Sequence, residues 1–255
     1  MQRNVPNKMT QYLVKSGVFK TGEARYCIRK VCSKSVKKRE IFVKIYLIRH
    51  GRTKDNEEKR FVGWQDTDLS EEGCLQAEKL ALRFQDKKIG ALYSSDLLRA
   101  IKTAEILGKK QGIKPRKSNM LREINFGEWE GLTYEEIMHS YKKEAQKWLK
   151  NPLLYSPPGG ESLLQVYARM EKFLNSLSPP ENNDEAIVLV SHGGAILSVL
   201  HKYLGLRKED IWKIKIKNTA ISLLQKKGAL FEVVFFNDVR HIENEMENDK
   251  MPELL

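Results

Sequence analysis

The sequence is poor in the features that mark secreted, zinc-binding or membrane-spanning proteins. Its 255 residues include only three cysteines, an odd number that does not suit a disulfide framework and favours a reducing compartment. Cys27 and Cys32 form a Cys-x4-Cys pair with no second pair, which is a poor zinc signature. No apolar run reaches the roughly 18 residues that a transmembrane helix needs. We therefore expect a cytoplasmic protein without a membrane span.

Histidines and acidic residues are not clustered at the spacing of metal ligands, and the chain has no internal repeat or low-complexity tract. We therefore expect no metal and no cofactor. Charged residues make up 31% of the chain and apolar residues 41%, which are globular proportions. This length and composition suit one α/β domain with a modest appendage.

Positive charge is concentrated at the N-terminus. Residues 1–42 hold eleven Lys and Arg against two acidic residues, so residues 43–255 account for only +3 of the net charge of +12. We expect residues 1–42 to be a basic extension, either flexible or a misread leader with Val43 as the natural start. A basic protein that binds polyanions through this segment is the alternative from another class. The segment has no recognisable nucleic-acid-binding fold, so nucleic acid is not favoured as a partner.

Apolar runs and helical periods alternate from Val43 onward. Val43–Ile48 and Ala186–Val190 are rich in β-branched residues, as in buried parallel strands. Strands that alternate with helices predict a mostly parallel central sheet covered on both faces, a three-layer α/β/α sandwich. We assign this domain to residues 43–240 and a polar C-terminal tail to residues 241–255.

Two similar motifs follow two of the predicted strands. Arg49-His50-Gly51 comes directly after the first, and Ser191-His192-Gly193-Gly194 comes directly after the most apolar one. The ligand crevice of such sheets lies at the carboxyl ends of the strands. Glycines let the backbone turn tightly and leave amide N–H groups free to face an anion. Two histidines, an arginine and exposed amides at one sheet edge predict a phosphate site.

The order of motifs resembles the histidine phosphatase superfamily, also called the phosphoglycerate mutase-like family. The likeness spans about Val43 to Phe236, and residues 1–42 lie outside it. Six motifs carry it, in the order of the family: Arg49–Asn56, Gly63–Gly73, Ser94–Ala100, Leu121–Gly131, Pro158–Ser162 and Ser191–Gly194.

The resemblance implies a role for each matching residue. His50 would be the nucleophile that carries phosphate, and Glu123 would be the general acid that protonates the leaving alcohol and then activates water. The phosphoryl group would be bound by Arg49, Gly51, Asn56, Arg99, His192 and Gly193. One departure is Arg52, because the family commonly has a glutamate there. This change adds positive charge near the site.

Phosphoryl transfer explains why these residue types are needed. A phosphoryl group carries about two negative charges, which bidentate arginines neutralise and orient. A neutral imidazole is a competent nucleophile if its other nitrogen donates to a fixed acceptor, such as a backbone carbonyl. A carboxyl can stay protonated if the bound phosphate raises its pKa. We assign Glu128 and Glu130 to loop geometry. Trp64, Trp129 and Tyr134 either line the pocket or pack in the core.

The connection after the predicted acid is short. Only 27 residues separate Gly131 from Gly159, whereas mutases of the family carry a longer insertion that encloses a bisphosphorylated intermediate. We therefore expect a metal-independent phosphatase of small-molecule phosphomonoesters. Leu121–Gly131 and the following Thr133–Ile137 look most like α-ribazole-5′-phosphate phosphatases of cobalamin biosynthesis. A broad-specificity histidine phosphatase and a phosphoglycerate mutase stay open as alternatives, as does a homodimer.

Overall fold

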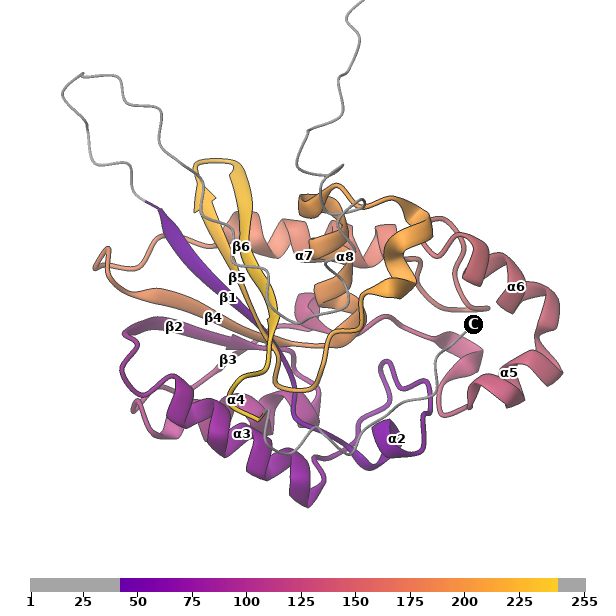
Figure 1. Ribbon diagram of the computed structural model, residues 1–255, viewed down its shortest axis with the longest axis horizontal. Coiled ribbons are helices and arrows are strands. Elements are labelled where there is room, and N and C mark those ends of the chain that lie inside the picture. The colour runs from indigo at the N-terminus through magenta and orange to yellow at the C-terminus, as the bar shows by residue number, and fades with distance from the viewer. Residues whose placement is uncertain (1–41, 243–255) are drawn as a thin grey trace, which may run out of the picture.

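A six-stranded sheet forms the centre of the molecule (Figure 1). The computed structural model describes residues 42–242, so the predicted basic extension, apart from Phe42, lies outside the described residues. The strands lie in the order β3-β2-β4-β1-β5-β6. Their bounds are Val43–Arg49 (β1), Ile89–Ser94 (β2), Arg116–Lys117 (β3), Ala186–Ser191 (β4), Ile221–Lys227 (β5) and Leu230–Asp238 (β6).

The sheet is mostly parallel, as predicted. β4 pairs in parallel with both β1 and β2, and β2 pairs in parallel with β3. β5 and β6 close the sheet as an antiparallel hairpin beside β1. The two-residue β3 was not predicted, because so short and exposed a strand carries no periodic signal.

Helices cover both faces of the sheet, so the predicted α/β/α sandwich is confirmed. α3 (Glu71–Arg83) and α4 (Leu98–Lys109) lie on one face, and α7 (Leu163–Ser176) and α8 (Gly193–Leu204) lie on the other (Figure 1). Neighbouring strand residues point to opposite faces. Leu47 therefore packs in the cluster that includes α7 and α8, whereas Ile48 packs with α3 and α4.

Smaller helices lie beyond the carboxyl ends of the parallel strands (Figure 1). They are α2 (Lys54–Glu57), α5 (Tyr134–Ser140) and α6 (Lys142–Lys150), with short 3-10 turns at Asn119–Leu121, Gly127–Trp129 and Lys208–Lys213. Thr133 and Glu136 form a capping box at the start of α5. The backbone breaks between α5 and α6 at Tyr141, with φ −130° and ψ 34°. Ile137 and Trp148 are buried on either side of this break.

The packed part of the chain runs to the end of the described residues. Val239 and Ile242 are buried, and the His241 ring contacts the Thr219 hydroxyl at 3.0 Å. The first two residues of the predicted tail thus belong to the packed domain, because Ile242 supplies an apolar side chain that the polar composition concealed.

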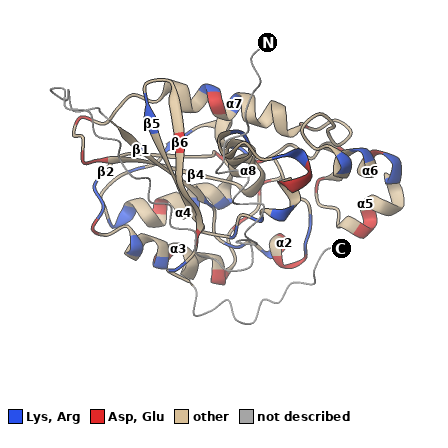
Figure 2. Cartoon of the chain, turned by 45° about the horizontal axis from the view of Figure 1, so that its top comes forward, with Lys and Arg blue, Asp and Glu red and all other residues tan. Residues whose placement is uncertain are grey.

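Acidic and basic side chains are interspersed along the helices (Figure 2). This pattern fits the near-neutral net charge of the chain after residue 42. Among residues 42–242, no helix is both long and apolar enough to cross a membrane.

Candidate active site

The two histidine motifs meet where β1 and β4 end. These strands are parallel neighbours in which Arg49 is opposite Ser191, so the following residues leave the sheet side by side. The ring centroids of His50 and His192 lie 5.0 Å apart, with an interplanar angle of 57°. The structure therefore brings together two residues that are far apart in the chain, as the strand-end argument predicted.

His50 is held in one orientation by backbone groups. Its backbone N–H donates to the carbonyl of Ser191 at 3.0 Å, and its ring Nδ1 lies 2.7 Å from the carbonyl oxygen of Gly51. A carbonyl can only accept, so Nδ1 carries the proton and Nε2 is the nitrogen with a lone pair. The predicted backbone acceptor is thus confirmed. Burial, followed by the charges of Arg99 and Arg49, lowers the pKa of His50 well below 6.5, which keeps the ring neutral at pH 7.

Gly51 supports the histidine and leaves no room for a side chain. A Cβ at this position would lie 2.4 Å from the carbonyl oxygen of Gly73. The Gly51 N–H donates to the Thr103 hydroxyl at 3.0 Å. This amide was predicted to contact the substrate, but its proton already has a partner inside the protein. The Gly51 carbonyl accepts from the ring of His50. A contact between Gly51 and the substrate stays a prediction.

Arg49 has one donor fixed and another available. Its Nη1 donates to the carbonyl of Ile216 at 2.6 Å, whereas its Nε is buried and has no partner among residues 42–242. Burial lowers the pKa of Arg49 to about 10, so the guanidinium stays charged at neutral pH. Gly193 lies beside it, because a Cβ there would sit 3.5 Å from that same Nε.

Arg99 comes from the first turn of α4 and is only 2% exposed. Its guanidinium donates to the carbonyls of Gln65 at 3.0 Å and Gly63 at 2.7 Å. The Glu130 carboxylate holds this loop, because it accepts the N–H groups of Gly63 at 2.9 Å and Trp64 at 2.8 Å. Glu130 therefore has the structural role that the sequence suggested.

His192 is fully buried, and neither ring nitrogen has a hydrogen-bond partner within the described part of the chain. Burial, followed by the charge of Arg99, lowers its pKa well below 6.5. Buried polar atoms of this kind cost about 1–3 kcal/mol when they stay unsatisfied. A ligand with acceptor oxygens would accept from the single N–H of the neutral His192 ring and from the Nε of Arg49.

Asn56 is oriented by a residue that the sequence did not indicate. Its Oδ1 accepts from the Thr53 N–H at 3.2 Å and from the Asn218 side chain at 3.1 Å. The oxygen is thereby fixed, and the amide NH2 group is directed away from these donors. Asn218 also donates to the carbonyl of His50 at 3.1 Å. It lies in the polar segment before β5, which offered no recognisable pattern.

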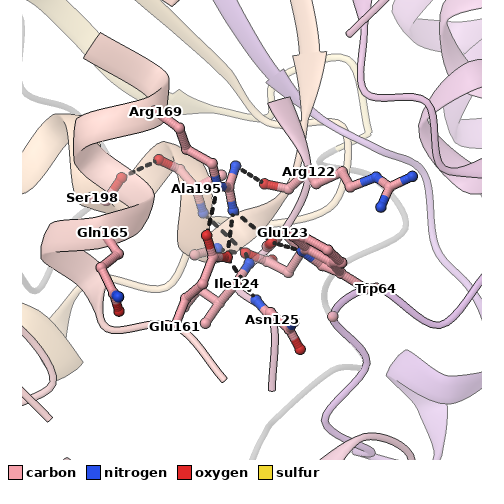
Figure 3. Close-up of polar contacts among 12 residues, drawn as sticks. Trp64, Arg122, Glu123, Ile124, Asn125, Glu161, Gln165, Arg169, Ala195 and Ser198 are labelled. Atoms are coloured by element: carbon pink, nitrogen blue, oxygen red, sulfur yellow. Dashed lines mark hydrogen bonds and ion pairs between the residues drawn. The ribbon is translucent and has the colours of Figure 1, made fainter. Parts of the chain in front are cut away.

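The carboxylate of Glu123 contacts the N-terminus of α8 (Figure 3). Its carboxylate accepts the N–H groups of Gly194, Ala195 and Ile124, at 3.0, 3.0 and 2.8 Å. The partial positive charge of a helix N-terminus favours an anion at this position. Gly194 must be a glycine, because a Cβ there would lie 2.6 Å from Glu123 Oε1. The predicted acid is thus connected directly to the segment that begins at His192.

Trp64 and Trp129 differ in their surroundings. Trp129 is 1% exposed and packs in the core, whereas Trp64 is 40% exposed and donates its indole N–H to the carbonyl of Glu123 at 3.0 Å. The guanidinium of Arg122 lies over the Trp64 ring at 4.9 Å (Figure 3). Tyr134 is also exposed. Trp64 therefore lies beside the predicted acid.

Arg52 is involved in ion pairs. Its guanidinium lies 2.9 Å from the Glu72 carboxylate and 3.5 Å from that of Glu57. Part of the extra positive charge near the site is therefore balanced by neighbouring acids. Among residues 42–242, no group of three or more His, Cys, Asp or Glu side chains is placed to hold a metal ion.

Comparison with known proteins identifies the family. Phosphoserine phosphatase 1 of Hydrogenobacter thermophilus is 30% identical over 200 residues, which cover 78% of this chain and 94% of that protein. The structure of mycobacterial glucosyl-3-phosphoglycerate phosphatase with VO3 shares 32% identity and a TM-score of 0.70, covering 76% of this chain and 98% of that one. These relatives support phosphoric monoester hydrolysis as the activity.

A third match is more distant. The α-ribazole phosphatase of Shigella flexneri shares 24% identity and a TM-score of 0.68, covering 77% of this chain and 97% of that one, and this likeness establishes the common fold. Residues 45–239 match the histidine phosphatase superfamily (branch 1) as a whole. The chain belongs to the histidine phosphatase superfamily.

Proposed function

We propose that the protein hydrolyses small aliphatic phosphomonoesters in two steps, through a phosphohistidine on His50. One observation carries the proposal. Within residues 42–242, neither ring nitrogen of His192 nor the Nε of Arg49 has a hydrogen-bond partner, and these atoms are buried beside an imidazole whose Nε2 carries a lone pair. These groups match the needs of a tetrahedral dianion attacked by a neutral nucleophile.

In the first step, His50 Nε2 attacks phosphorus and the bond to the ester oxygen breaks. The leaving oxygen takes the bonding pair together with a proton from Glu123. The Nδ1–H of His50 keeps its bond to Gly51, so the positive charge that develops on the ring is stabilised by that carbonyl. Arg49 and Arg99 neutralise the phosphoryl oxygens during transfer.

The proton on Glu123 needs a source. Its carboxylate oxygens accept three backbone N–H groups, and none of these groups supplies that proton. A phosphomonoester has a second pKa of about 6, so its monoanion can deliver one proton to the carboxylate as it binds. In the second step the carboxylate takes a proton from water, whose oxygen attacks phosphorus and breaks the bond to His50.

The proposed substrate class follows from the presence of a general acid that can protonate the leaving group. An aliphatic alkoxide is a poor leaving group, and the relatives named for phosphoserine and glucosyl-3-phosphoglycerate point to phosphate esters of aliphatic alcohols. α-Ribazole 5′-phosphate, with a role in cobalamin biosynthesis, is the narrower prediction within this class. The short connection between Gly131 and Gly159 favours hydrolysis over a mutase reaction.

A panel of phosphomonoesters tests the proposal. It comprises α-ribazole 5′-phosphate, phosphoserine, glucosyl-3-phosphoglycerate, and 3-phosphoglycerate with 2,3-bisphosphoglycerate. We expect release of inorganic phosphate, with kcat/KM for the preferred ester at least about tenfold above the others, a difference of roughly 1.4 kcal/mol. A preference for α-ribazole 5′-phosphate would support the narrower prediction. Isomerisation of 3-phosphoglycerate faster than any hydrolysis would contradict the proposal.

A further inference from the structure

Arg169 of α7 binds the segment that carries Glu123 (Figure 3). Its guanidinium donates to the carbonyls of Met120 at 2.9 Å, Arg122 at 2.6 Å and Glu123 at 2.7 Å. These residues lie at and beyond the 3-10 turn that ends at Leu121, and none of them belongs to a strand of the described sheet. Arg169 thus supplies the donors that a neighbouring strand would otherwise provide.

Glu161 fixes the orientation of Arg169. Its two carboxylate oxygens accept from Nε and Nη2 of Arg169, each at 3.0 Å. The same carboxylate accepts the Asn125 N–H at 2.9 Å, so it also contacts the segment after Glu123. The five N–H groups of Arg169 therefore all have acceptors. Lysine has no planar fork of donors and cannot reproduce this pattern.

Glu123 is consequently held from two sides. Arg169 binds its backbone carbonyl, while the N–H groups of Gly194 and Ala195 bind its carboxylate. A general acid must lie within hydrogen-bond reach of the atom that it protonates, and a small displacement lowers the rate strongly. The Trp64 indole N–H also donates to the Glu123 backbone carbonyl, at 3.0 Å.

We propose that Arg169, oriented by Glu161, is a positioning residue that holds Glu123 where it can protonate the leaving group. The inference rests on the proposed function of Glu123. Arg169 is turned toward carbonyl oxygens and the Glu161 carboxylate, so it acts through Glu123 and does not bind the phosphoryl group.

Leaving-group dependence separates positioning from general support of the fold. p-Nitrophenyl phosphate releases an activated phenolate that needs little protonation, whereas β-glycerophosphate releases an alkoxide that needs much. For Arg169→Lys we expect kcat/KM to fall at least about tenfold more on β-glycerophosphate than on p-nitrophenyl phosphate, within the 10² to 10⁴ that an acid contributes. Tyr167→Phe is the matched control, since it removes a hydrogen bond to Glu171 from the same helix. It should leave the ratio of the two rates unchanged.

A double-mutant cycle with Glu123→Gln completes the test. If Arg169 acts through Glu123, Arg169→Lys should barely change the ratio in the Glu123→Gln background. Equal losses on both esters for Arg169→Lys, together with a selective loss for Glu123→Gln, would overturn the positioning role and leave the proposed function intact. Equal losses for Glu123→Gln itself would overturn both.

Glu161→Gln provides a second variant in case Arg169→Lys does not fold. It keeps the guanidinium and its carbonyl contacts but removes one side of the bidentate ion pair. We expect kcat/KM to fall about three- to tenfold more on β-glycerophosphate than on p-nitrophenyl phosphate, a smaller selective loss than for Arg169→Lys. The melting temperature is measured on the same samples. A folded Glu161→Gln protein with an unchanged ratio would contradict the inference.

Discussion

The carbonyl oxygen of Gly51 lies 2.7 Å from Nδ1 of His50, and this contact determines which ring nitrogen is protonated. Because the proton sits on Nδ1, the lone pair of Nε2 is available at neutral pH. Gly51 is itself fixed by Thr103 and by its close approach to Gly73. The backbone of the loop after β1 thus orients the proposed nucleophile before any substrate binds.

His192→Ala should separate activity from stability. Its ring nitrogens have no partner among the described residues, so their removal relieves a desolvation cost and offsets the cavity that is created. We expect kcat/KM to fall by about 10² to 10³, the size of a lost oxyanion-hole donor, while the melting temperature changes little. Inorganic phosphate should raise the melting temperature of wild type more than that of the variant. A normal kcat/KM in the variant would exclude His192 from phosphate binding.

Asn218→Ala should lower kcat/KM by about tenfold, because it removes the donor that fixes the Asn56 amide. The same change in an Asn56→Ala background should have a smaller effect, since part of its action passes through Asn56. Steady-state kinetics on the four proteins of this cycle measure the difference. Fully additive effects would show that Asn218 acts only on the backbone of His50.

The stability of the protein should fall as pH drops below 6.5. His50 and His192 are neutral in the folded state because burial lowers their pKa, whereas in the unfolded chain they titrate near 6.5. Below that pH the unfolded state binds more protons, so the free energy of unfolding decreases by up to about 1.4 kcal/mol per pH unit for each histidine. The lowered pKa of His241, about 4, acts in the same direction.

Urea unfolding in phosphate-free buffer between pH 7.5 and 5 checks this dependence. His192→Gln should show a shallower slope than wild type, because one titrating group is removed. An identical slope in both proteins would mean that His192 is not neutral when folded.

Exhaustive chelation should leave kcat within about twofold, well under the tenfold that roughly 1.4 kcal/mol represents. The reason is that, in the proposed mechanism, Arg49 and Arg99 supply the positive charge at the site and neutral His192 supplies a hydrogen-bond donor. Activity measured before and after dialysis against EDTA tests this. A large loss restored by one divalent ion would refute metal independence.

The sequence revealed the parts of the site that depend on strand ends. The sequence predicted that Arg49, His50 and His192 lie close together, because buried parallel strands end at one edge of a sheet. Glu123 was indicated only by the family resemblance. Its contact with the N-terminus of α8 is made between segments about 70 residues apart in the chain, so no local pattern predicts it.

Contacts that depend on exact register were beyond reach. Asn218 meets His50 and Asn56 only because β5 lies antiparallel beside β1, and its polar neighbours carry no periodicity. In the same way, no sequence pattern indicates that Thr103 takes the Gly51 N–H. Side-chain contacts of this kind follow from packing between elements and not from local preference.

Trapping of the phosphoenzyme tests the central claim most directly. Turnover of a substrate with a radiolabelled phosphoryl group, quenched in alkaline denaturant, should leave label on the protein that brief acid treatment removes. His50→Ala should carry none, whereas His139→Ala, which changes an exposed histidine of α5, should carry as much as wild type. Label retained by His50→Ala, or no label in a turning-over wild-type enzyme, would contradict the phosphohistidine mechanism.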